Sequence, residues 1–156
     1  MADLVVTLTE SVIINGTQRG SQNTLTIANV KHTFERVVTV PANSDGTVVL
    51  NKDTIASSDG AVDIQDTKYI RITNLDATNN VNLSLQIDTG NDDSAADNSA
   101  SISLPAGYSF IMGTPHDAIA VSSENASVIT AMKDLESIIV DSADQNVKVE
   151  VFVAGV

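Results

Sequence analysis

The sequence contains no cysteine and no tryptophan, and aromatic residues make up only 3% of its 156 residues. Without cysteine the chain forms neither disulfides nor thiolate metal sites, which leaves its compartment open because secreted proteins can also fold without them. Sugar-binding sites usually stack pyranose rings on tryptophan or tyrosine. Only Tyr69 and Tyr108 are available for that role, so the composition weakens a carbohydrate-binding function.

Basic residues are also few. Eight Lys and Arg residues oppose twenty Asp and Glu residues, which gives a formal net charge of −12. The cations are scattered singly, whereas nucleic-acid binding relies on clustered cations that release counterions from phosphates. An anionic membrane surface is disfavoured for the same reason. We therefore expect neither a nucleic-acid nor a membrane partner. The acidity suits solubility at high local concentration, and halophilic or marine adaptation gives the same balance.

The start of the chain, from Met1 to Val6, lacks a basic n-region and passes almost directly into an apolar run. No apolar segment of the sequence is long enough to cross a bilayer. We therefore expect no signal peptide, and synthesis and folding in a cytoplasm.

Motifs that carry catalytic chemistry are scarce. There is no G-x-S-x-G nucleophile elbow and no glycine-rich phosphate loop ending in Lys-Ser or Lys-Thr. Of the two histidines, His32 is expected at a strand edge and His116 on a surface turn. Asp117 follows His116, but neighbours on an extended chain point to opposite faces, so we expect a poor proton relay. A Ser-His-Asp set stays open in principle, because serine and aspartate are plentiful. We predict no catalytic residue, no cofactor and no metal site.

Acidic residues cluster in two expected loops. They are Asp88, Asp92, Asp93 and Asp97 in the first loop, and Asp59, Asp63 and Asp66 in the second. Ca²⁺ takes six to eight oxygen ligands, but neither cluster has the spacing of an EF-hand. We predict solvated loops without a tight Ca²⁺ site.

What the sequence does contain is typical of β structure. Val, Ile, Leu and Ala supply most apolar residues, and Ser, Thr, Asn, Asp and Gly fill most of the remainder. Candidate strands are residues 4–9, 11–14, 24–30, 34–40, 47–50, 69–75, 81–87, 102–104, 108–112, 118–121, 138–141 and 147–153. Apolar residues alternate in the segments 81–87 and 147–153, which indicates strands with one buried face. The pattern predicts an all-β fold, an antiparallel β-sandwich or small barrel (jelly-roll-like), over one domain of residues 1–156.

Three local expectations accompany this fold. Residues 69–75 and 81–87 flank a polar turn at residues 76–80, which is a hairpin signature. Residues 88–100 are expected to form a long exposed loop. Residues 127–135 combine helical spacing with a high Ser and Thr content, so a short helix and a loop are equally supported there.

Two segments resemble small virion proteins of tailed bacteriophages. Residues 69–79 (YIRITNLDATN) resemble a hairpin in those proteins, and residues 104–110 (LPAGYSF) resemble an "L-P-A-G-x-S-F" step. The opening, through residues 15–20 (NGTQRG), is also similar. The resemblance covers about a third of the chain and implies a β-rich accessory virion protein, which in such families is usually a homo-oligomer and often a trimer. It carries no functional residues over.

Both ends of the sequence are apolar, at Leu4 to Val6 and at Val149 to Val156. Such ends are expected to be strands paired in a sheet, either within the chain or with neighbouring subunits. We therefore predict a structural virion protein that decorates or stabilises a phage capsid without catalysis. Its expected partners are the major capsid protein or another virion protein, and further copies of itself, with a homotrimer favoured. The alternatives are a tail or fibre component and a carbohydrate- or receptor-binding β module.

Overall fold

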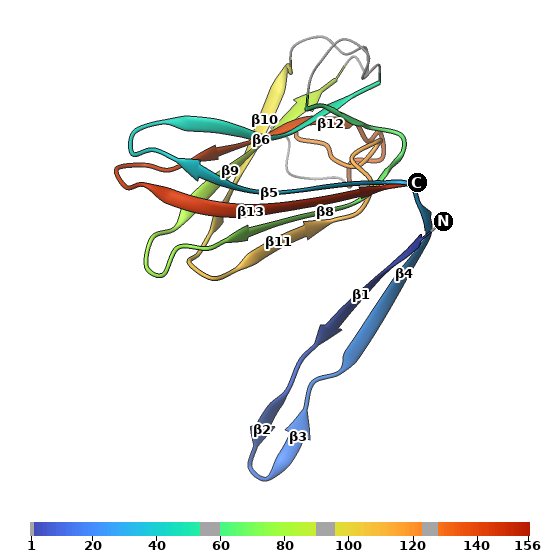
Figure 1. Cartoon of the computed structure of the whole chain (residues 1–156), viewed down its shortest axis with the longest axis vertical. Helices are drawn as coiled ribbons and strands as arrows, with labels where there is room; N and C mark the ends of the chain where they lie inside the picture. Colours follow the sequence, from blue (N-terminus) through green and yellow to red (C-terminus); the bar gives the residue numbers. More distant parts are fainter. Residues whose placement is uncertain (1, 54–59, 90–95, 123–127) are drawn as a thin grey trace.

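The computed structural model describes residues 2–53, 60–89, 96–122 and 128–156. These residues form two packed β-sheets and a long two-stranded ribbon that projects from one end of them (Figure 1). No helix occurs in the described residues, and so none that could cross a membrane. The expected all-β antiparallel sandwich is confirmed, and the described strands do not close into a barrel.

The two sheets of the sandwich have five and four strands. In the five-stranded sheet the order is β10 (Asn98–Leu104), β9 (Val81–Asp88), β12 (Asp134–Asp141), β6 (Asp45–Lys52) and β7 (Val62–Asp63). In the four-stranded sheet the order is β11 (Ser109–Met112), β8 (Thr67–Asn74), β13 (Val147–Gly155) and β5 (His32–Val40). Neighbouring strands are antiparallel except for the short parallel pair β6 and β7.

The core lies between these sheets and follows from the period-2 alternation of the strands. The four valines of β13 are buried: Val147, Val149, Val151 and Val153. Across the core, β9 buries Val81, Leu83, Leu85 and Ile87. Fully burying an aliphatic side chain contributes about 1.5–3 kcal/mol, so these two strands supply much of the driving force for folding. Both were predicted from the sequence.

The predicted hairpin between β8 and β9 is wrong, because the two strands belong to different sheets. Ile70 and Ile72 of β8 are buried against the same core as Leu83 of β9. Two strands that each bury a whole apolar face can share a core most simply by lying in opposite sheets. The turn at residues 76–80 therefore carries the chain from one sheet to the other.

Two further local expectations are corrected. Leu135 belongs to β12, and the described residues 128–133 contain no helix, because the buried alternation of Ile138 and Val140 extends back to Leu135 through a bulge. Asp88 is a buried residue at the end of β9 instead of the start of an exposed loop, and β10 already begins at Asn98. In the expected strand 118–121, only Ile119 forms an isolated bridge.

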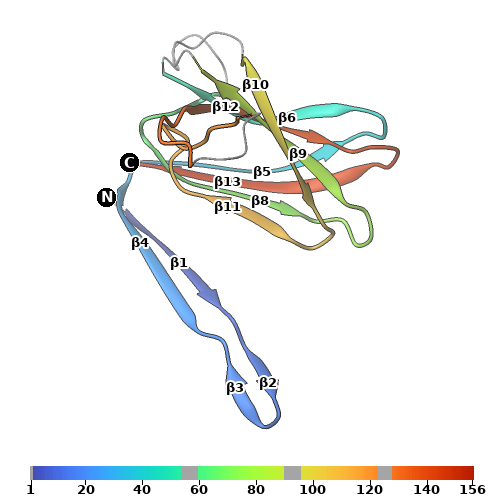
Figure 2. The same ribbon diagram turned by 180° about the vertical axis from the view of Figure 1, so that it is seen from behind.

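The ribbon consists of β1 (Ala2–Thr9) paired with β4 (Gln22–Val30), and of β2 (Val12–Ile14) paired with β3 (Thr17–Arg19) at its tip. Asn15 and Gly16 close the tip with φ angles of 51° and 76°, as in the tight turns that suit antiparallel hairpins. In both views the ribbon leaves the sandwich beside the C-terminus and points away from it (Figures 1 and 2). The apolar start of the chain thus pairs with β4, outside the sandwich sheets.

The apolar C-terminal run has a different position. β13 pairs with β8 on one side and with β5 on the other. It is therefore an internal strand, and its pairing within the chain is the simpler of the two expected arrangements.

Candidate interaction surface

The ribbon has one apolar and one polar face. Its register sets Leu4 opposite Ile27 and Val6 opposite Leu25. Directly opposed residues point to the same side of a sheet. Together with Leu8 these residues form what we call the apolar ribbon face: Leu4, Val6, Leu8, Leu25 and Ile27. The reverse side is mostly threonine, from the pairs Val5–Thr26, Thr7–Thr24 and Thr9–Gln22.

The apolar ribbon face remains in contact with water along much of its length. Leu8 is 54% exposed and Leu25 is 52% exposed. Nearer the sandwich, Leu4, Val6 and Ile27 are partly covered. A two-stranded hairpin is marginally stable in water without a third strand or a packed face. The ribbon therefore exposes apolar area that the rest of the described chain does not cover.

A second apolar surface lies on the outer side of the four-stranded sheet. In β13 the residues between the buried valines point outward, which places Phe152 on this side, next to Tyr69 and Arg71 of β8 and to Glu35 of β5. The Tyr69 and Phe152 rings meet edge to face, with centroids 6.1 Å apart. We call this the outer apolar face: Val37, Tyr69, Ile111 and Phe152.

Burial and a nearby charge have opposite effects on the pKa of Tyr69 in this face. Burial raises the pKa of the Tyr69 hydroxyl, and the nearby Arg71 guanidinium opposes that shift. Arg71 also forms an ion pair with Glu150, at 2.6 Å between Nη1 and Oε2. Ile111 and Val37 remain 47% and 57% exposed, and they lie opposite Arg71 and Glu150, so exposed apolar and charged side chains alternate around the aromatic pair.

The outer side of the five-stranded sheet is polar by contrast along β9 and β10. Its facing pairs across β9 and β10 are Asn82–Ser103, Ser84–Ser101 and Gln86–Ser99. Polar side chains of this kind are readily solvated, as expected for an antiparallel sheet with one face in water. The two outer sides of the sandwich therefore differ in chemistry, and among the described strands only those of the four-stranded sheet turn aromatic side chains outward.

Strand β1 and the outer apolar face line an open groove of about 370 Å³. One wall is β1 from Leu4 to Leu8, and the other contains Tyr69, Arg71, Ile111 and Phe152. The groove brings together two segments that are distant in the sequence. The sequence predicted both sets of strands, but it gave no signal that the first pair would leave the sandwich.

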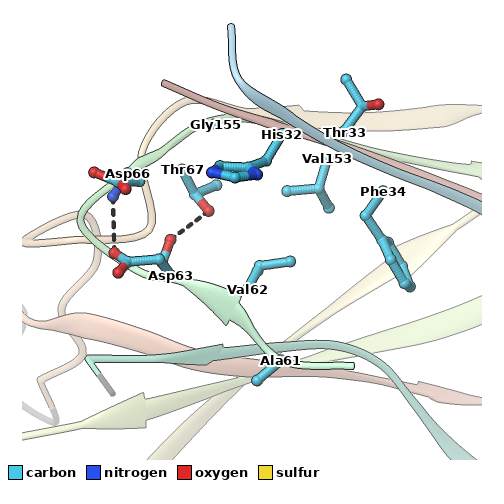
Figure 3. A pocket seen from close by; sticks show the side chains of 10 residues that line it. All are labelled: His32, Thr33, Phe34, Ala61, Val62, Asp63, Asp66, Thr67, Val153 and Gly155. Carbon is cyan, nitrogen blue, oxygen red and sulfur yellow. Dashed lines mark hydrogen bonds between the residues drawn. The ribbon is translucent and has the colours of Figure 1, made fainter. Parts of the chain in front are cut away.

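A smaller pocket of about 270 Å³ lies at the end of the sandwich beside His32 and Gly155 (Figure 3). Its acidic residues, Asp63 and Asp66, come from the second predicted acidic loop. The Asp63 carboxylate accepts hydrogen bonds from the backbone N–H groups of Gln65 and Asp66, at 2.8 and 3.0 Å. It is therefore engaged in holding a turn. His32 begins β5, an edge strand, as predicted.

Three titratable residues meet at one turn. His116 Nδ1 lies 3.0 Å from Asp134 Oδ1, and His116 Nε2 lies 3.4 Å from Asp117 Oδ2. The expectation that His116 and Asp117 point apart is wrong, because Asp117 has a φ of 47° and the chain is not extended there. The donor set could in principle hold a metal ion. However, Asp134 Oδ1 also accepts the backbone N–H of Asp117 at 2.7 Å, which indicates a role in fixing the turn.

The first predicted acidic loop is described only in part. Asp97 accepts a hydrogen bond from the backbone N–H of Thr89 at 3.3 Å, which ties the two ends of the loop together. Asp59, Asp92 and Asp93 lie outside the described residues. The absence of a tight Ca²⁺ site thus stays a prediction.

No protein-family model, curated protein or solved structure matched this chain. Its function is argued below from its own residues and surfaces.

Proposed function

We propose that this chain is a structural protein of a bacteriophage virion, which decorates or stabilises the capsid through contacts with the major capsid protein or another virion protein. The observation that carries the proposal is the projecting ribbon with its exposed apolar face. Contiguous apolar surface on a soluble protein marks a site of interaction. The resemblance of residues 69–79 and 104–110 to small virion proteins indicates the kind of particle.

The acidic composition supports the same function. A net charge of −12 on 156 residues keeps copies apart in solution until specific apolar surfaces bring them together. In this proposal the chain acts without catalysis, as a homo-oligomer with a trimer favoured, and is located in the virion after synthesis in the host cytoplasm.

The carbohydrate-binding alternative has a single exposed aromatic residue in its favour. Tyr108 is 65% exposed, whereas Tyr69 is buried and its ring contacts Phe152. One exposed ring offers little area for stacking a sugar. Binding of the purified chain to a glycan array would support this alternative over the structural role.

Imaging of particles tests the proposal directly. Phage particles assembled with and without this chain would be compared by electron cryomicroscopy, together with their resistance to heat. We expect additional density on the capsid lattice only when the chain is present, and earlier capsid rupture without it. Density confined to the tail would support the tail or fibre alternative. If particles assembled in the presence of the chain contained none of it, a virion role would be contradicted.

A further inference from the structure

We infer that the apolar ribbon face of one copy docks on the outer apolar face of a second copy, so that neighbouring copies exchange ribbons. The inference deepens the self-association part of the proposed function and does not depend on the virion. The molecule that covers each of the two surfaces is a second copy of this chain, and four observations support this choice.

The first observation is that the chain's own sandwich leaves a part of each surface uncovered. Leu8 and Leu25 remain about half exposed on the ribbon, as do Ile111 and Val37 on the sheet. The ribbon points away from the sandwich in both views (Figures 1 and 2). The groove between them is open, so the fold buries Tyr69 and part of Leu4, Val6 and Ile27 but leaves the rest of both surfaces in contact with water.

The second observation is that the two surfaces match in kind. Both are apolar, and both belong to every copy of the chain. A contact between the ribbon of one copy and the sheet of another covers both surfaces at once. A different protein would need two separate binding surfaces to do the same.

The third observation concerns size. Residues 2–15 form one side of the ribbon, and at about 3.3 Å per residue they span about 45 Å. Two strands at a spacing of about 4.8 Å then give one side of the whole ribbon, tip included, an area on the order of 450 Å². A stable interface buries about 800 Å² on each partner. A single docked ribbon falls short of this, whereas in an exchange each copy gives one ribbon and receives another, which roughly doubles the buried area.

The fourth observation concerns charge. The ribbon, residues 2–30, carries Arg19 against Asp3 and Glu10, a net charge of −1. The outer side of the four-stranded sheet has a balanced set of charges: Arg71 and Lys148 with Glu35 and Glu150. In a chain of net charge −12, these are surfaces at which two copies can approach with little local repulsion.

Cross-linking provides the test, because the chain has no cysteine of its own. Purified Leu8→Cys and Ile111→Cys variants would be mixed and oxidised. We expect a disulfide-linked species of twice the 16.3 kDa chain mass, formed in the mixture in excess of either variant alone. Thr24→Cys mixed with Ile111→Cys is the matched control, since Thr24 lies on the reverse side of the ribbon and outside the groove, and its yield should be several-fold lower.

Two outcomes of this experiment would overturn the inference. The first is equal cross-linking by Thr24→Cys and Leu8→Cys. The second is a Leu8→Cys/Ile111→Cys double variant that forms only an intrachain disulfide, because the ribbon would then close on its own sandwich.

Light scattering coupled to gel filtration supplies an independent readout. The unmodified chain should be an oligomer at high micromolar concentration. Leu25→Asp should lose the oligomer, and the adjacent Thr24→Asp, on the reverse side of the ribbon, should keep it. A stable monomer of 16.3 kDa for the unmodified chain would contradict ribbon exchange. If such a monomer still bound capsids, the proposed function would stand and only this inference would fail.

Discussion

At the scale of single residues, polar side chains hold the crossing from one sheet to the other. Asn74 is buried at the end of β8, and its amide donates to the backbone carbonyl groups of Asn79 and Leu104 at 2.8 and 3.1 Å. The Asp76 carboxylate accepts the backbone N–H groups of Thr78 and Asn79 at 2.9 and 2.8 Å. These contacts explain why residues 76–80, which are rich in turn formers, make a connection between sheets.

The hydrogen bonds to Asp76 predict a dependence of stability on pH. The backbone N–H groups of Asn79 and Thr78 lower the pKa of Asp76 below its usual 3.8. Because the folded pKa is the lower one, its contribution is fully present above the unfolded pKa and is lost as pH falls through the folded pKa. Asp76→Asn keeps an oxygen acceptor but cannot titrate. The free energy of unfolding, measured by urea titration from about pH 2 to 6, should fall less steeply with acid in this variant. Identical pH profiles would contradict the role of Asp76.

Neighbouring residues of β9 predict very different effects on stability. Leu83 is fully buried and Asn82 is exposed on the outer side of the sheet. Leu83→Ala should lower the free energy of unfolding by about 2–5 kcal/mol, because it leaves a cavity in the core. Asn82→Ala should change it by less than about 0.5 kcal/mol, as is usual for surface substitutions. Chemical denaturation of both variants measures the difference, and equal stabilities would mean that the assigned register is wrong.

At the scale of elements, the sequence determined which segments are strands better than which strands pair. The alternating valines of β13 and the alternating aliphatic residues of β9 predicted buried faces correctly, because period-2 burial is a local property. The assignment of β8 and β9 to opposite sheets depends on contacts across the whole core, which no local pattern contains. The His116 contacts were missed for a related reason, since they require the positive φ of Asp117.

The positions of the terminal strands predict opposite outcomes for two deletions. Deleting residues 149–156 removes most of β13, an internal strand with partners on both sides, and opens the core. We expect an insoluble product. Deleting residues 2–30 removes the ribbon, which contributes none of the buried core residues, and should leave a soluble, folded sandwich. Solubility and far-ultraviolet circular dichroism of the two products check this, and a folded product of the first deletion would mean that β13 is dispensable.

At the scale of the whole molecule, the sandwich is strongly acidic, whereas the ribbon that projects from it is nearly neutral and has one apolar face. The ribbon holds only three of the chain's charged residues, and the remainder of the chain holds most of the acidic excess. In the ribbon exchange that we propose, long-range repulsion opposes association, while contacts at the ribbon and the outer apolar face favour it. The balance between the two depends on ionic strength.

This balance predicts that salt strengthens self-association. Raising the salt concentration from about 0.01 M to 0.1 M shortens the Debye length from about 30 Å to about 10 Å. Repulsion between copies of net charge −12 weakens accordingly, whereas apolar contacts of the ribbon are not screened. Sedimentation equilibrium should show a larger average mass at the higher concentration, and Leu25→Asp should remain monomeric at both. A mass that falls with added salt would mean instead that opposite charges hold the copies together, and that the apolar ribbon face is not the main contact.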